Sequence, residues 1–243
     1  MSDRPPVSAI SSAARVFTLT WPSVAWARRT PWLLPLLAWP LLPPLLGRLA
    51  GVPSEWTASV GWIYRDVLLP LAVLFQASRL IRQDVESGTI VYLLARPAPR
   101  ASIVAGQFAA YAAAALAVVL PAIAAGFVLG ARAQGLDVLA SALAVSTAVV
   151  VLYGAFFMLA GLMLKKPMVP GLVAVLVALA LSYFPGGLSL LSPTTHLRTL
   201  SGDPPPLPEL TALMAAGVLA LAAVACLATA VIVFKNGEYL PEP

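Results

Sequence analysis

Six long apolar runs are the feature of this sequence that most restricts its fold. They cover roughly residues 31–50, 62–81, 102–130, 138–164, 168–185 and 209–234. A helix needs about 20 such residues to cross the hydrocarbon core of a membrane. The chain is 60% hydrophobic and 10% charged, whereas a soluble domain carries about 25% charged residues. We therefore predict an all-α integral membrane protein with six transmembrane helices.

The basic residues between these runs predict the orientation, because lysine and arginine stay on the cytoplasmic side. With the N-terminus inside, 11 of the 15 basic residues are cytoplasmic. The outer four are Arg48, Arg65, Arg132 and Arg198. An even number of spans also places the C-terminus inside. The predicted location is the plasma (inner) membrane of a bacterium.

Two domains are expected. Residues 1–30 form a cytoplasmic tail with an amphipathic helix in the membrane interface, because apolar and tryptophan side chains lie among small polar residues before Arg28 and Arg29. Residues 31–243 form the six-span domain. Its first run contains several prolines, which should kink or split the helix. The last outer loop, about 185–208, is long, and its apolar LSLL piece is expected to form a short re-entrant helix.

No catalytic motif occurs in the sequence. The phosphate-binding G-x-x-x-x-G-K-[ST] loop, G-x-S-x-G and H-E-x-x-H are all missing. One histidine, His196, and one cysteine, Cys226, cannot form a metal cluster, and scattered basic residues do not predict nucleic-acid binding. Arg65 and Asp66 are expected at the membrane surface, and His196 in an ordinary loop. We expect no enzyme, cofactor or metal in this chain.

The cytoplasmic connection between the second and third runs differs from the others. Its residues about 83–96 place Ile90, Leu93 and Leu94 on one side of a helix, with Asp84 and Glu86 near its N-terminal end. This pattern predicts a short amphipathic helix. The pattern alone leaves open whether the helix rests on lipid or docks to a soluble partner.

The run from Glu86 to Arg100 resembles the E-x-G-T-x-x-x-L-L-x-x-P-x-x-R signature of ABC-2-type permeases, the membrane-spanning subunits of ATP-driven exporters. The layout of spans, tail and outer loop is also similar, although Gln107 stands where the family often has lysine. The resemblance implies a coupling helix that docks to a cytosolic ATPase subunit, which binds ATP and Mg, and a second permease as partner. The implied docking residues are Asp84, Glu86, Gly88, Thr89, Ile90, Leu93, Leu94, Pro97 and Arg100.

A substrate path between two permeases is expected to include polar residues of the second and fifth runs, namely Gln76, Ser78, Ser182 and Tyr183. Ordinary hydrogen bonding between helices is the simpler explanation of the same residues. Gly154, Gly161 and Gly171 are expected to let helices pack closely. A membrane scaffold or assembly factor, and a substrate-capture binding subunit, stay open as alternatives to a permease.

Overall fold

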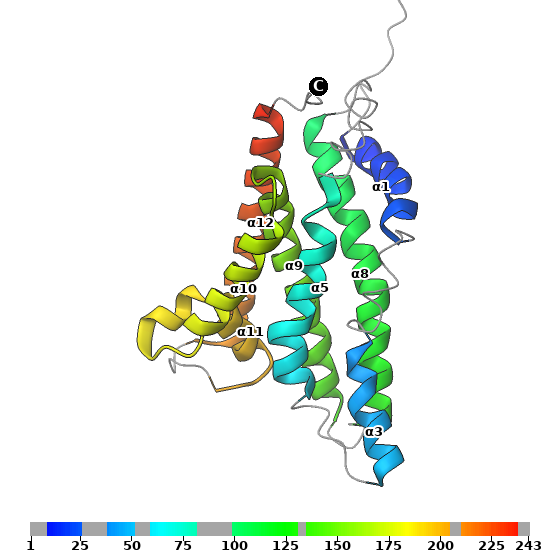
Figure 1. Ribbon diagram of the computed structural model, residues 1–243, viewed down its shortest axis with the longest axis vertical. Helices are drawn as coiled ribbons and strands as arrows, with labels where there is room; N and C mark the ends of the chain where they lie inside the picture. Colours follow the sequence, from blue (N-terminus) through cyan, green and yellow to red (C-terminus); the bar gives the residue numbers. More distant parts are fainter. Residues whose placement is uncertain are drawn as a thin grey trace, which may run out of the picture.

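The computed structural model describes residues 9–25, 38–51, 59–81, 99–130, 135–204 and 210–237, and every regular element in these ranges is helical (Figure 1). This confirms the all-α prediction for the described part of the chain. Three of its helices are long and apolar enough to cross a membrane, namely α8 (Arg100–Gly130), α9 (Leu136–Met163) and α12 (Ala212–Asn236). Each exceeds the roughly 30 Å of a hydrocarbon core.

Helix α9 lies at the centre of the bundle, in contact with α5, α8 and α12. Of its most apolar stretch, 56% is buried inside the protein, against 33% for α8 and 22% for α12. The outer helices therefore turn most of their apolar surface away from the protein, as lipid-facing helices do. The fifth predicted run forms α10 (Met168–Leu181), a shorter apolar helix of 14 residues.

The first two apolar runs form broken helices where the structure describes them. The first contains a 3₁₀ turn, η1 (Trp39–Leu41), followed by α3 (Leu42–Ala50), as its prolines predicted. The second begins as a π-helix, η2 (Ser59–Leu68), and continues as α5 (Leu69–Ala77). Pro70 has no N–H to donate to the carbonyl of the preceding turn, so the helix changes its hydrogen-bond pattern near this point.

Three glycines bring neighbouring helices into close contact, which confirms the expected packing role. A Cβ atom at any of them would meet an atom of the next helix at less than a normal contact distance. The pairs are Gly154 with Tyr111, Gly161 with Ser78, and Gly171 with Leu74. Two of these partners belong to the helix of the second run, which is therefore held between α9 and α10.

The N-terminal helix, α1 (Ala9–Ala25), packs against the first half of α8 (Figure 1). Val16 is buried in this contact, and a Cβ on Gly106 of α8 would lie 2.7 Å from the carbonyl oxygen of Ala13. Leu19, in contrast, is 53% exposed. A helix is therefore present in the predicted tail, with one face on the protein, and its position in the membrane interface stays a prediction.

The long loop after α10 contains two short helices rather than one. They are a 3₁₀ helix, η4 (Gly186–Leu191), and α11 (Pro193–Leu200). Ser192 caps α11, because its Oγ accepts a hydrogen bond from the backbone N–H of Thr194 at 3.2 Å. The predicted LSLL helix corresponds to η4, whereas α11 was not predicted. Figure 1 shows both beside α10, at the end of the bundle opposite the start of α8.

Candidate functional site

A cluster of charged side chains, buried around Arg65 and Asp66, joins η2 to α11. Arg65 Nε donates to Asp66 Oδ1 at 2.6 Å, and Arg198 Nη2 donates to Asp66 Oδ2 at 2.9 Å. Arg65 Nη1 donates to Asp203 Oδ2 at 3.1 Å and also to Ser201 Oγ. The side chains of Arg65 and Asp66 are only 6% and 1% exposed. Two arginines balance two aspartates, so the cluster carries no net charge.

The turn that ends α11 brings Asp203 to this cluster. Gly202 has a φ of +91°, a left-handed conformation that glycine adopts without strain. The backbone N–H of Asp203 then donates to the carbonyl oxygen of Arg198 at 3.0 Å. A glycine turn thus fixes the position of the fourth charge.

The prediction that Arg65 and Asp66 lie at the surface was wrong, since these residues are 5% and 3% exposed. A buried carboxylate is tolerated only when it is paired and hydrogen-bonded. Arg198 supplies the second cation from 132 residues further along the chain. Because sequence inspection paired Asp66 only with its neighbour, it missed the contact that makes burial possible.

Arg198 also lies over an aromatic ring, with its Cζ 4.5 Å from the centroid of Tyr183. Burial alone would lower the pKa of Arg198, but the interaction with Tyr183 and the charge of Asp66 outweigh it and raise the pKa above its ordinary value. The same contacts with Asp66 and Tyr183 that hold the guanidinium in place therefore favour its charged form.

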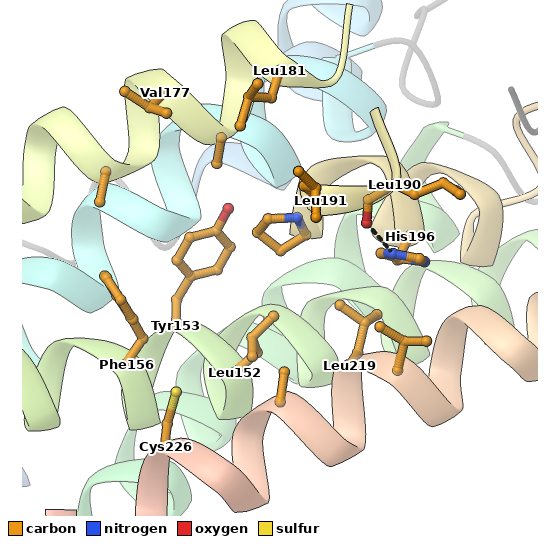
Figure 2. A pocket seen from close by; sticks show the side chains of 15 residues that line it. Leu152, Tyr153, Phe156, Val177, Leu181, Leu190, Leu191, His196, Leu219 and Cys226 are labelled. Carbon is orange, nitrogen blue, oxygen red and sulfur yellow. Dashed lines mark hydrogen bonds between the residues drawn. The ribbon is translucent and has the colours of Figure 1, made fainter. Parts of the chain in front are cut away.

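An apolar cavity of about 400 Å³ lies next to α11, between α9, α10 and α12 (Figure 2). Its size is within the range of small-molecule sites. Its wall consists of Leu152, Tyr153, Phe156, Ala174, Val177, Ala178, Leu181, Leu190, Leu191, Pro193, His196, Val218, Leu219, Ala222 and Cys226. Since few of these side chains are polar, the cavity suits an apolar ligand better than an ion.

His196 is the polar group of the cavity wall that lacks a full set of partners. It is 5% exposed, and its Nε2 lies 2.9 Å from the carbonyl oxygen of Leu190 (Figure 2). Among the described residues, its Nδ1 has no hydrogen-bond partner. The prediction of an ordinary loop histidine was therefore wrong, because α11 turns this side chain inward. Tyr153, another polar residue of the wall, has Thr194 as its side-chain partner.

A comparison with protein families decides where the chain belongs. The model of the family described as Protein of unknown function (DUF2705) matches residues 51–240. The chain belongs to this family. The matched region includes the ion cluster, the cavity and the whole DUF2705 bundle from η2 to α12. No curated protein matches the chain.

The four residues predicted for a substrate path do not lie together in this DUF2705 chain. Ser78 is buried near the C-terminal end of α9, where it donates to the carbonyl oxygen of Leu74 at 2.6 Å. Gln76 lies two residues before it. Ser182 and Tyr183 follow the last turn of α10, which is the end of that helix far from Ser78. Ser182 donates to Leu179 O at 2.7 Å, so both serines have local partners.

The segment predicted to couple to an ATPase, residues 82–98, lies outside the described residues of the DUF2705 chain. Of the predicted docking residues only Arg100 is described. It is exposed at the start of α8, and its Nη1 donates to the carbonyl oxygen of Lys235 at 2.5 Å. The helices on either side of the segment, α5 and α8, are both parts of the packed bundle.

One signal for the missed residues is present in the sequence. The Ser192-Pro193 pair is a typical helix start, with serine at the cap and proline in the first turn. Treating it as a helix would have placed the polar Thr194 to Thr199 segment in an ordered element. No signal within the described ranges indicates a metal site, since no group of three or more His, Cys, Asp or Glu residues occurs there.

Proposed function

We propose that this DUF2705 chain is the membrane-spanning permease subunit of an ABC exporter in the bacterial plasma membrane. The observation that carries the proposal is the Glu86 to Arg100 signature, which connects two helices of an all-helical apolar bundle. In the proposed arrangement six spans cross the membrane, and both termini and the signature are cytoplasmic. A separate ATPase subunit hydrolyses ATP with Mg, and a second permease completes the path.

The structure supports a route for force through the chain. The signature follows the helix of the second run, whose Leu74 and Ser78 lie against Gly171 and Gly161 of neighbouring helices. Such close contacts leave little room for independent sliding. At the other end the same run holds Asp66, which is bonded to α11. A displacement of the signature would therefore move the central helices and the α11 segment together.

Charge reversal at Glu86 tests this proposal. The chain is co-expressed with the ATPase subunit that a tagged copy retains in mild detergent, and ATPase stimulation is measured in lipid vesicles. Glu86→Arg should abolish stimulation while the chain still inserts and folds. Asp137→Arg is the matched control, because Asp137 is exposed in the first turn of α9, at the opposite end from Arg100. Full stimulation by the Glu86 variant would disprove the docking role.

The apolar cavity favours one alternative, a substrate-capture binding subunit. Such a subunit would bind its ligand without an ATPase and would not stimulate one. Two results together would favour this alternative over the permease. The purified chain would bind a ligand, and Glu86→Arg would leave the activity of any co-purified ATPase unchanged.

A further inference from the structure

We propose that the end of the bundle at the start of α8 binds the phosphate groups of anionic phospholipids through a rim of exposed basic side chains. The inference goes beyond the permease proposal, because it concerns this chain and the lipid around it and requires neither an ATPase nor a second permease. The basic rim consists of Arg79, Arg100, Lys165, Lys166 and Lys235.

A buried apolar cluster brings the residues of the basic rim to one end of the molecule. The cluster contains Ile81 of the second run, Ile103 of α8, Met158 of α9 and Phe234 of α12. Each basic residue of the rim lies at or next to the terminus of one of these elements, with its side chain exposed. The bond from Arg100 to the carbonyl oxygen of Lys235 also joins the start of α8 to the end of α12 (Figure 1).

Acidic side chains do not balance this rim within the described part of the chain. The three described carboxylates, Asp66, Asp137 and Asp203, all lie at the opposite end of the bundle. Residues 82–98 and 238–243, outside the described part, contain two arginines and four acidic residues, so their side-chain charge of −2 leaves the five cations in excess. A surface with such an excess of one sign attracts anionic groups.

Exposed apolar side chains beside the lysines favour a lipid over a soluble anion or a cytosolic protein. Met163 and Val169, on either side of Lys166, are 63% and 68% exposed, and Ile232, three residues before Lys235, is 57% exposed. In a phospholipid a phosphate group likewise lies next to acyl chains. A lysine can lay its stem along the apolar surface while its ammonium group reaches the phosphate. The rim therefore fits an anionic phospholipid better than an ATPase.

Native mass spectrometry of the purified full chain tests the lipid preference. The probes are phosphatidylglycerol and phosphatidylcholine with identical acyl chains, added to the delipidated chain in detergent. Phosphatidylglycerol should bind more tightly, by about fivefold for each cation that contacts it. A tenfold higher salt concentration should reduce this preference, because salt screens the attraction between exposed charges.

Neutralising single lysines locates the preference on the rim. Lys166→Gln and Lys235→Gln should each weaken phosphatidylglycerol binding about fivefold and leave phosphatidylcholine binding unchanged. Lys166→Arg keeps the charge and should keep the preference. Arg48→Gln is the matched control, because Arg48 is also exposed among exposed leucines but belongs to α3, at the end that holds the described carboxylates. It should leave the preference nearly unchanged.

Thermal unfolding of the normal chain gives a second readout that needs no variant to fold. Phosphatidylglycerol should raise the unfolding temperature more than phosphatidylcholine or inorganic phosphate does. Equal effects of both lipids, or an effect of inorganic phosphate as large as that of phosphatidylglycerol, would overturn the proposal. An equal loss of preference in Arg48→Gln and Lys166→Gln would also overturn it.

The ATPase is the competing partner for the basic rim. If Lys166→Gln lost a co-purifying ATPase but kept the preference for phosphatidylglycerol, the rim would belong to the ATPase and the lipid proposal would be wrong. Failure of the permease proposal gives a different result. Full ATPase stimulation by the Glu86→Arg variant would disprove the docking role, while the lipid preference of the normal chain would stay as it is.

Discussion

The two ends of the bundle hold their charged residues in opposite ways. At the Asp66 end, Arg65 and Arg198 pair with Asp66 and Asp203 in a neutral cluster, in which the Asp66 side chain is 1% exposed. At the Arg100 end, Arg100 is exposed and bonds to the backbone of Lys235. Charge at one end therefore holds elements of this chain together, whereas charge at the other end stays accessible to lipid or a partner.

Asp66→Asn should have the largest effect on this difference. The substitution leaves the buried Arg65 and the partly buried Arg198 with Asp203 as the carboxylate of the cluster, and unpaired buried charge costs about 3–5 kcal/mol of stability. Unfolding in increasing mole fractions of sodium dodecyl sulfate measures the loss. Asp203→Asn is the control, since the Asp203 side chain is 50% exposed, and it should cost far less. If both variants lost the same stability, burial of the carboxylate would not determine how much the cluster stabilises the protein.

Arg198→Lys tests the geometry of the same cluster while keeping its charge. A lysine cannot reproduce the two guanidinium bonds to Asp66 or the planar contact with Tyr183. We expect a loss of about 1.5–3 kcal/mol in the same unfolding assay, which is the value of a hydrogen bond to a charged group. A stability equal to that of the normal chain would show that charge alone is sufficient at this position.

Gly161→Ala tests whether close packing of helices, rather than charge, holds the Arg100 end together. The new methyl group would meet the backbone carbonyl of Ser78, and overpacking of this kind costs about 1–3 kcal/mol. Gly217→Ala on α12 is the control, because nothing lies within 4 Å of a Cβ there. Thermal unfolding of the two variants in detergent should separate them clearly. If Gly161→Ala is as stable as Gly217→Ala, close packing is not the cohesive interaction at this end.

Arg100→Ala should have the smallest effect on folding. The side chain is exposed and makes one bond to a carbonyl, so the loss should be at most about 1 kcal/mol. If the permease proposal is right, the same variant should weaken ATPase binding much more than it weakens the fold. The two values come from unfolding and from co-purification at matched expression levels. A large loss of stability would mean that charged side chains hold the elements together at the Arg100 end as they do at the Asp66 end.

The main helices could be predicted from sequence because the information is local. The predicted spans 102–130, 138–164 and 209–234 correspond to α8, α9 and α12, since an apolar run of this length fixes its own backbone. The break in the first run was predicted from its prolines, whereas the change from π-helix to α-helix in the second run was not. The glycine contacts also followed from residue type.

The site could not be predicted in the same way. Asp66 is buried because of Arg198, and no pattern within either segment reports a contact between positions so far apart. His196 faces inward because α11 folds back on α9 and α12, which the polar composition of that segment concealed. The substrate-path prediction relied on residue type without position, and the coupling residues from Asp84 to Pro97 stay a prediction.

The adjacency of Arg65 and Asp66 has a consequence for biosynthesis. As the ribosome delivers the second apolar run, the carboxylate of Asp66 emerges directly after the guanidinium of Arg65, so this stretch is nearly neutral from the start. Arg198 is translated 132 residues after Asp66. The α11 segment can therefore be fastened only after most of the polypeptide has been made, which makes that closure a late event in the assembly of the protein.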